Sequence, residues 1–178
     1  MSAYPQPDLR YPTGPFSMPH DVAAEEREQH IADIAAAPFK LRTAVLGLTT
    51  QQLDTHYRPG GWTVRQVVHH LPDSHMNSYI RFKLALTEHE PAIKTYHEHL
   101  WAQLPDSTLG IEVSLRLLEA LHTRWVALLQ AMTAEDFART LKHPEIGVMR
   151  LDQVLALYSW HSRHHVAHIT SLRERMGW

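Results

Sequence analysis

The chain has 178 residues, a formal net charge of −2 at pH 7 and no cysteine, which fits one domain with a continuous core and no disulfide. Its 17 lysines and arginines are scattered rather than clustered, which argues against a nucleic-acid-binding surface and predicts no nucleic-acid partner. Without thiolate ligands, any metal site must be built from histidine and carboxylate side chains.

The predicted domain spans residues 1–178 and begins with a proline-rich extended lead over residues 1–20. The first 19 residues, MSAYPQPDLRYPTGPFSMP, contain five prolines and no apolar run as long as that of a signal peptide. No later stretch approaches the roughly 18 apolar residues of a membrane span. The sequence therefore predicts a cytoplasmic protein without a membrane partner.

Long stretches rich in Leu, Ala, Glu and Arg, with only seven glycines, predict helices through most of the chain. The first predicted helix covers residues 23–48 and has one apolar stripe, with Pro38 marking a kink or a break. A short turn and loop follow over residues 49–62. The second helix opens at Thr63, where the Thr-x-x-Gln pattern completed by Gln66 forms a capping box, and it runs to about Thr87.

The second half of the chain contains two more predicted helices. A connection over residues 91–110 is long enough to form a lid or the wall of a pocket. The third helix spans residues 111–132 with a clear apolar seam, and the sequence KHPEIGVM links it to the fourth, over residues 151–175. Four amphipathic helices joined partly by long connections predict an all-α four-helix bundle, with the functional site inside it.

Histidines replace apolar residues in the middle of the seam of the last predicted helix. At spacings of three and four, this seam contains Leu151, Val154, Tyr158, His161, His165, His168 and Leu172. His161 and His165 are one turn apart on one face, so their imidazoles can reach one ion. A hydrogen-bonded histidine cluster is the alternative, because buried imidazoles need partners for both ring nitrogens. The rival pair of His164 and His168 is disfavoured, since His164 lies about 100° from His165.

A stripe on the second predicted helix offers a third ligand. It begins with polar side chains, continues into apolar ones, and contains Gln66, His70, Asp73, Asn77, Ile80 and Leu84. Such a stripe is expected to line a pocket that closes into the core, because a surface position for its polar half would also expose Ile80 and Leu84. His70 is then the best third ligand. Asp73 is a catalytic candidate for orienting a ligand or transferring a proton, with a surface acid as the alternative, and Asn77 is a candidate for binding substrate.

The third predicted helix carries His122 on its apolar seam, between Leu118 and Trp125. This histidine is expected to be a fourth ligand, a partner behind a ligand, or a core histidine bonded to a carbonyl group. His168 has the same alternatives on the last helix. Spacing alone leaves them open.

Two stretches, YRPGGWTVRQVVHHLPDSHMNSYIRFKLALTE and WHSRHHVAHITSLRERMGW, closely resemble the YfiT branch of the DinB-like superfamily, and the resemblance covers nearly the whole chain. It implies a four-helix bundle, usually a homodimer, that holds one divalent metal ion per subunit through three histidines. The residues that match the family ligands are His70, His161 and His165. Two positions depart from the family pattern. Pro72 replaces Ala and is expected to perturb the helix near the first ligand, and Arg150 replaces the Thr that caps the last helix, where Asp152 compensates in part.

The resemblance also implies an activity at the metal. Members of the family have been labelled metal-dependent hydrolases, and a related branch resembles transferases that conjugate the thiol bacillithiol to electrophiles. Three neutral imidazoles leave an ion its full charge and an open position, which is typical of a catalytic site. We therefore expect a metal-dependent thiol S-transferase with zinc or nickel as the metal and bacillithiol as cosubstrate. The alternatives are a hydrolase that activates water to attack an ester or amide, and a non-enzymatic, metal-stabilised dimeric stress module.

Overall fold

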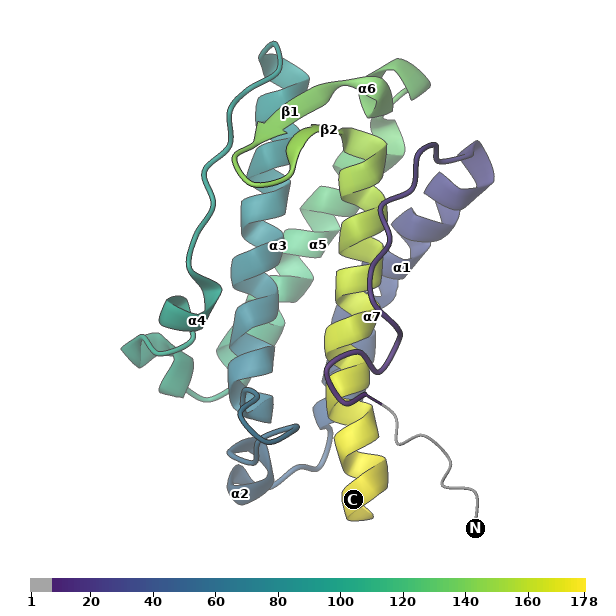
Figure 1. Cartoon of the computed structure of the whole chain (residues 1–178). Coiled ribbons are helices and arrows are strands. Elements are labelled where there is room, and N and C mark those ends of the chain that lie inside the picture. The colour runs from purple at the N-terminus through teal and green to yellow at the C-terminus, as the bar shows by residue number, and fades with distance from the viewer. Residues whose placement is uncertain (1–7) are drawn as a thin grey trace.

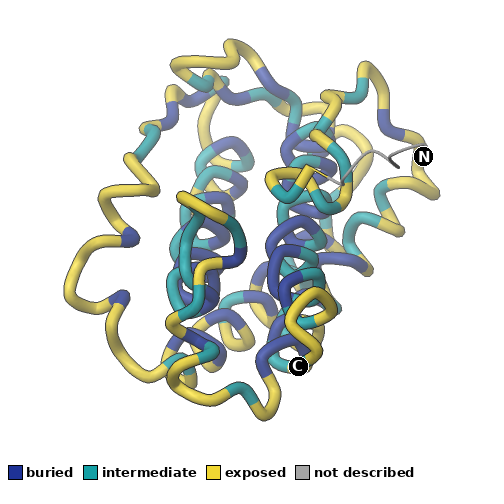
Figure 2. The backbone as a smooth tube through the Cα atoms, turned by 60° about the horizontal axis from the view of Figure 1, so that its bottom comes forward, coloured by how far each residue is buried: buried dark blue, intermediate teal, exposed yellow. Residues whose placement is uncertain are grey.

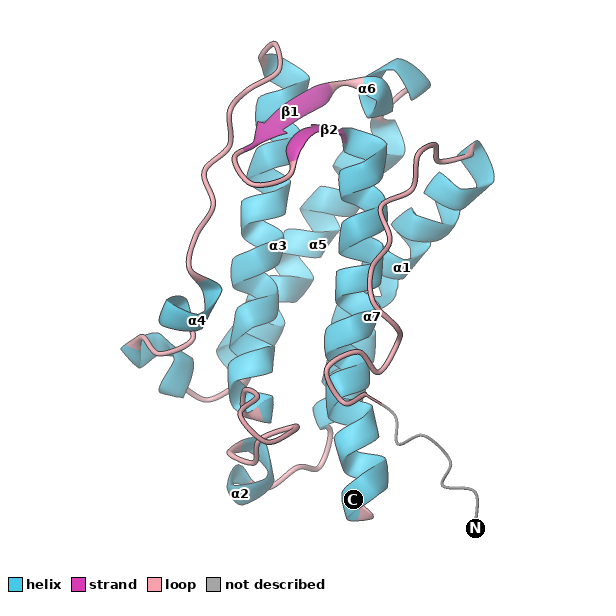
Figure 3. Cartoon of the chain, in the orientation of Figure 1, coloured by secondary structure: helices cyan, strands magenta, loops and turns pink. Residues whose placement is uncertain are grey.

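The computed structural model describes residues 8–178, so residues 1–7 of the proline-rich lead lie outside the described residues. Four long helices form the body of the molecule (Figures 1 and 3), which confirms the predicted all-α four-helix bundle. These helices are α1 (Ala24–Val45), α3 (Val64–Thr87), α5 (Glu112–Ala131) and α7 (Leu151–Met176). Helix α1 packs against α5 and α7, and α3 packs against the same two helices from the other side.

The connections contain short elements that the sequence did not predict. They are α2 (Thr50–Leu53), α4 (Glu98–Trp101), a 3-10 turn (Pro105–Thr108), α6 (Ala134–Ala138), and the antiparallel pair β1 (Thr140–His143) and β2 (Gly147–Arg150). The small sheet caps one end of the bundle (Figure 3). Its turn closes because Gly147 adopts a φ of 92°, a region that favours glycine, and because His143 Nδ1 accepts the amide hydrogens of Glu145 and Ile146.

The N-terminal ends of α3 and α7 are capped in different ways. At the start of α3, the Thr63 hydroxyl accepts from the Gln66 amide at 3.1 Å and Gln66 Oε1 accepts from the Thr63 amide at 3.0 Å, which confirms the predicted capping box. At the start of α7, Arg150 cannot supply the hydroxyl acceptor. Instead its amide donates to Gln153 Oε1 at 3.0 Å, and its side chain lies 3.0 Å from Asp152.

Both internal prolines are accommodated without ending their helices. Helix α1 continues through Pro38, so of the predicted kink or break the break is wrong, and α3 continues through Pro72. Proline has no N–H, so Pro38 cannot donate to the Ile34 carbonyl one turn earlier. His122 on α5 supplies the missing donor, with its Nδ1 2.6 Å from the Ile34 oxygen. A side chain of a neighbouring helix thus satisfies the carbonyl that the proline leaves free.

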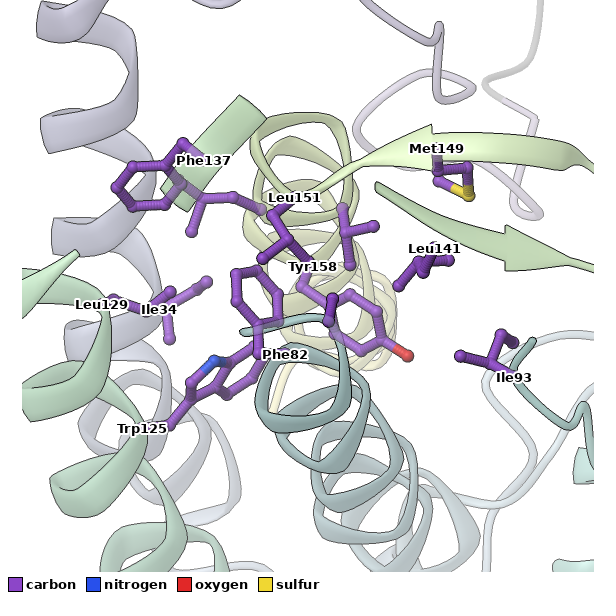
Figure 4. Close-up of a cluster of buried hydrophobic side chains, with 13 residues drawn as sticks. Ile34, Phe82, Ile93, Trp125, Leu129, Phe137, Leu141, Met149, Leu151 and Tyr158 are labelled. Carbon is purple, nitrogen blue, oxygen red and sulfur yellow. The ribbon is translucent and has the colours of Figure 1, made fainter. Parts of the chain in front are cut away.

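Two apolar clusters fill the bundle, and a layer of histidines separates them. Figure 2 shows that the buried parts of the helices face inward. One cluster is built around Phe82, Trp125 and Tyr158 (Figure 4), whose rings make edge contacts with centroids 5.7 Å apart. The other contains Leu71, Leu118 and Ile169, among other side chains. Burying each large apolar side chain stabilises the fold by roughly 1.5–3 kcal/mol. The two clusters thereby stabilise the bundle on both sides of the histidine layer.

The lead runs along α7, on the side away from α3 and α5 (Figure 1). Its carbonyl groups accept hydrogen bonds from α7: Trp160 Nε1 donates to Gly14 at 3.0 Å, and Gln153 Nε2 donates to Pro19 at 2.9 Å. These contacts fix an otherwise irregular segment against the bundle. Within residues 8–178, no helix combines the length and the apolar character that crossing a membrane requires.

Candidate metal centre

Three histidines from two helices converge between the apolar clusters. His70 comes from α3, and His161 and His165 come from successive turns of α7. One ring nitrogen of each lies within 4.8 Å of those of the other two, and His70 Nε2 is 3.3 Å from His161 Nε2. Within the described residues, this is the one group of three or more potential ligand side chains arranged in this way. The structure therefore brings together the three residues that the sequence predicted as ligands.

The three rings are uncharged at neutral pH. Burial lowers the pKa of His70 to about 3. Burial, followed by the neighbouring imidazoles, lowers the pKa values of His161 and His165 well below their usual range. Each ring therefore carries one lone pair in a site with little solvent, and His165 Nδ1 is buried without a hydrogen-bond partner. Neutral imidazoles with converging nitrogen atoms are a donor set that suits a divalent ion such as zinc, so the residues present fit a metal.

A cavity of about 700 Å³ opens onto the three histidines, a size typical of small-molecule sites. Its wall comes from segments far apart in the chain: residues 10–11 of the lead, residues 57–62, residues 95–99, and the hairpin turn at residues 143–145. The long connection thus forms part of the wall, as the sequence predicted. The wall carries both charges, with arginines at three positions and glutamates at two, namely Arg10, Arg58, Arg81, Glu98 and Glu145.

Three hydroxyl groups near the histidines were not singled out from the sequence as site residues. Ser74, Tyr96 and Tyr158 all line the cavity. The Tyr158 hydroxyl donates to the Ser74 carbonyl oxygen at 3.3 Å. Burial raises the pKa of Tyr96 well above its usual range, so this hydroxyl stays protonated and can donate a hydrogen bond. Ser74 lies one turn after His70, a spacing that could have identified it.

A fourth buried histidine, His75, also contacts the cluster and was missed in the sequence. It is 0% exposed, and its Nε2 lies 3.1 Å from His161 Nδ1. Its other nitrogen, Nδ1, lies 2.7 Å from His122 Nε2. His122 is bonded to a carbonyl group, which was one of its three predicted alternatives, and it reaches His161 only through His75. His75 falls four residues after Leu71 on an apolar stripe, and this periodicity was the signal that could have found it.

Asp73 and Asn77 lie outside the wall of the cavity as the described residues form it. Burial, with a smaller contribution from the charge of Asp106, raises the pKa of Asp73 to about 6. Asn77 Nδ2 donates to the backbone carbonyl of Asp73 at 2.9 Å. Ile80 is 49% exposed, so the stripe that contains both residues does not close into the core there as predicted. Their catalytic roles remain predictions, and their positions favour indirect ones.

The pair of His164 and His168 lies beside the cluster and not within it. His164 stacks on Trp160 with ring centroids 4.3 Å apart, and His168 stacks on Tyr57 at 3.9 Å. His168 Nε2 lies 3.2 Å from the Arg10 carbonyl oxygen, which makes it a donor. Burial lowers the pKa of each histidine to about 4. Aromatic packing and a backbone hydrogen bond therefore account for their positions.

Pro72 leaves the ligand geometry intact. His70 lies two residues before it and still directs Nε2 toward His161, and the Trp62 ring packs against His70 with centroids 4.6 Å apart. The predicted perturbation of His70 by this proline is not seen in the position of the side chain.

Comparisons with known proteins agree with this architecture. The family model of the DinB superfamily matches residues 33–169. Proteins from Bacillus cereus (strain 03BB102) and Bacillus thuringiensis subsp. konkukian (strain 97-27) are each 56% identical over 171 residues, covering 96% of this chain and 99% of each relative. Both carry the name "Putative metal-dependent hydrolase".

A solved structure is similar over nearly the same length. It is described as "YfiT from Bacillus subtilis is a probable metal-dependent hydrolase with an unusual four-helix bundle topology". It is 52% identical, superposes with a TM-score of 0.93, and covers 96% of this chain and 98% of its own. Together with the three converging histidines, these similarities show that the chain belongs to the DinB/YfiT-like superfamily.

Proposed function

We propose that the protein is a metal-dependent thiol S-transferase. In this proposal His70, His161 and His165 hold one divalent ion, zinc or nickel, and a small-molecule thiol such as bacillithiol is transferred to an electrophile. The observation that carries the proposal is the convergence of three neutral imidazoles on an open cavity. Three protein ligands leave a coordination position for a reactant, whereas a structural site is usually closed by four.

When bound, the ion would act as a Lewis acid that lowers the pKa of a coordinated thiol or water. The protein itself contains no cysteine, so no side-chain thiol competes for the ion or for the electrophile. The thiol must therefore enter as a cosubstrate.

The wall of the cavity suits a polar cosubstrate beside a second reactant. A volume of about 700 Å³ exceeds what a single small nucleophile needs. Arg58 and Arg81 offer guanidinium groups that can bind carboxylates, and the protonated hydroxyl of Tyr96 can donate to a substrate oxygen. Trp62 packs over His70 and limits the access of water on that side.

The test is a conjugation assay with protein purified without exposure to nickel and then loaded with zinc. Bacillithiol and monochlorobimane serve as thiol and electrophile, and product fluorescence gives the rate. We expect conjugation at least about 100-fold faster than with the His165→Ala variant, because loss of a ligand weakens the site. His89→Ala is the matched control, since His89 is exposed and does not line the cavity. Equal rates for the wild-type and His165→Ala proteins would contradict the proposal.

The names of the relatives favour a second candidate, a metal-dependent hydrolase that uses the same three ligands. In this case the coordinated nucleophile is water, and the substrate is an ester, an amide or a lactone. Panels of these substrates, assayed with zinc and without thiol, distinguish the two. Turnover that requires the metal but no thiol would establish the hydrolase.

We also propose a homodimer, which the resemblance to the YfiT branch implies. Size-exclusion chromatography with light scattering tests it directly, because the subunit mass is 20.5 kDa. A mass of one subunit at micromolar concentration would contradict this assignment.

A further inference from the structure

Three imidazoles, two of them buried and that of His161 half-buried, form an unbroken path from α1 to the candidate metal centre. The Ile34 carbonyl oxygen lies 2.6 Å from His122 Nδ1, His122 Nε2 lies 2.7 Å from His75 Nδ1, and His75 Nε2 lies 3.1 Å from His161 Nδ1. His75 is 0% exposed and His122 is 2% exposed. We call this path, from Ile34 to His161, the histidine relay.

The direction of every hydrogen bond in the relay follows from its first atom. A carbonyl oxygen can only accept, so His122 Nδ1 must carry the proton. A neutral imidazole has one N–H, so His122 Nε2 accepts, and His75 Nδ1 must donate to it. By the same step His75 Nε2 accepts from His161 Nδ1. His161 is thus left with a bare lone pair on Nε2.

The ring that starts the relay is neutral, because burial lowers the pKa of His122 to about 4. The opposite order would place the lone pair of His122 Nδ1 against the Ile34 carbonyl oxygen. Leaving such buried groups unsatisfied is unfavourable, so the first order is strongly preferred.

We propose that His75 and His122 are positioning residues that fix the tautomer and the ring orientation of His161, so that its Nε2 faces the metal position. The proposal rests on the metal site of the proposed function. It also gives Pro38 a role, because the missing amide of the proline leaves the Ile34 carbonyl free to anchor the relay. A histidine that binds a metal usually donates its second N–H to a carboxylate or carbonyl. Here His122 and His75 lie between the carbonyl group and the ligand, and the carbonyl sets the direction of the hydrogen bonds through both rings.

The lone pair that the relay fixes points at the cluster. His161 Nε2 lies 3.3 Å from His70 Nε2, the nitrogen atom that His70 directs toward it. At its other end, the relay reaches a second hollow of about 450 Å³, which His122 and Pro38 line. The relay therefore spans the width of the bundle. A substitution at His122 is expected to change the tautomer or the ring orientation of His161.

The first test is the tautomer itself, measured on the metal-free protein. Long-range correlation of ring ¹⁵N and ¹H nuclei in histidine-labelled protein at pH 7.5 distinguishes a protonated nitrogen from a bare one. We expect Nδ1 to be protonated in His75, His122 and His161. A His161 ring protonated on Nε2 would overturn the proposal, and this measurement needs neither a variant nor a metal.

The second test compares variants of His122 by zinc affinity, measured in competition with a chromophoric chelator. His122→Phe removes both hydrogen-bonding atoms and is expected to weaken zinc binding about 10- to 100-fold. His122→Gln keeps one donor and one acceptor, and we expect it to restore affinity to within about 3-fold of the wild type. In the ¹⁵N spectrum, His122→Phe should show a mixture of His161 tautomers, whereas His122→Gln should show a single one.

His69→Phe is the matched control for general damage to the core. His69 is also buried on α3 and also bonds to α5, with Nδ1 2.7 Å from the Ser114 hydroxyl, but it lies outside the relay. Comparable losses of affinity in His69→Phe and His122→Phe would show a merely structural role and overturn the proposal. Unchanged affinity and tautomer in a folded His122→Phe protein would do the same. A wild-type protein that binds no zinc would contradict the proposed function, while the tautomer measurement would still decide the relay.

Discussion

The two ring nitrogens of His161 face different neighbours. Nδ1 meets His75, whereas Nε2 meets His70 and the cavity. A substitution at this position therefore removes a ligand and also leaves the buried His75 without its donor. His165 lacks such a partner, since its Nδ1 is buried without a hydrogen bond. The two candidate ligands on α7 are thus unequal, although their sequence spacing makes them look equivalent.

Replacing His161 should impair the protein more than replacing His165, because it affects both zinc affinity and the stability of the metal-free protein. We expect His161→Ala to lower zinc affinity more than about 100-fold and, in the metal-free protein, to lower the free energy of unfolding by about 1–3 kcal/mol, because His75 Nε2 loses its donor. Chelator competition and urea denaturation measure the two effects. His165→Ala should lose affinity without the same loss of metal-free stability. Equal metal-free stabilities of His161→Ala and the wild type would refute this reading.

Asp73 destabilises the native state when it is ionised, because its carboxylate is partly buried, and asparagine would remove this charge. Its pKa is raised from 3.8 to about 6, so the native state holds its proton more tightly than the unfolded state, and stability from this group is lost as pH rises through about 6. At pH 8, Asp73→Asn should therefore stabilise the protein by about 1 kcal/mol, after allowance for solvent screening. Urea denaturation at pH 8 and pH 5 measures the difference. Destabilisation at pH 8, or a large loss of turnover, would favour the predicted catalytic role instead.

At the scale of helices, each of three apolar seams is interrupted by histidine at the same level of the bundle. His75 follows Leu71 on α3, His122 follows Leu118 on α5, and α7 contributes its own histidines. Periodicity within each helix predicted the four long helices and most of their ends. It could not predict the relay, because the relative height of two helices is set by packing between them, and a single seam carries no information about that height.

The β-hairpin, and the continuation of α1 through Pro38, also could not be predicted from local sequence patterns. Strands of four residues are too short for an alternating pattern to stand out, and the turn between them depends on the single positive φ of Gly147. The break expected at Pro38 was wrong because the rule for proline counts only bonds within the helix. His122, 88 residues away in sequence, supplies the missing bond.

The proline-rich lead is predicted to stabilise the site from outside the bundle. Truncation of residues 1–18 removes the acceptors at Arg10 and Gly14, leaves His168 and Trp160 of α7 without partners, and opens the cavity wall at Tyr11. With each of these half-buried hydrogen bonds worth about 1 kcal/mol, we expect the melting temperature to fall by about 4–8 °C. Differential scanning calorimetry measures this shift. An unchanged melting temperature would show that the lead does not contribute to the fold.

For the whole molecule, the buried neutral histidines should make the metal-free protein sensitive to mild acid. The folded-state pKa of His122 is lowered from 6.5 to about 4, so below pH 6.5 the unfolded chain takes up a proton that the native chain excludes. Its contribution to stability is complete above pH 6.5 and is lost at about 1.4 kcal/mol per pH unit as pH falls toward 4. His164 and His168 shift in the same direction.

We therefore expect metal-free protein to unfold between about pH 6 and pH 4, as followed by far-ultraviolet circular dichroism. The His122→Phe variant lacks one of these groups and should show a shallower dependence of stability on pH, whatever its stability at pH 7. A melting temperature that stays constant from pH 7 to pH 4 would contradict the assignment of neutral buried histidines.

The convergence of the three candidate ligands was predictable from the sequence, but their surroundings were not. The spacing of His161 and His165 places both on one helix face, and the family resemblance identified His70 as their partner. The stripe on α3 also pointed to His70, although Ile80 on that stripe is exposed and not buried as predicted. The wall of the cavity comes from four segments outside the long helices, and their meeting depends on tertiary packing that no local pattern encodes.

Anomalous diffraction at the zinc edge, from crystals of protein loaded with one equivalent of zinc, shows whether the three histidines hold an ion. We predict one strong peak, with ring nitrogens of His70, His161 and His165 about 2.0–2.1 Å away and His161 bound through Nε2. A peak between His164 and His168, or no peak at the three histidines, would contradict the account.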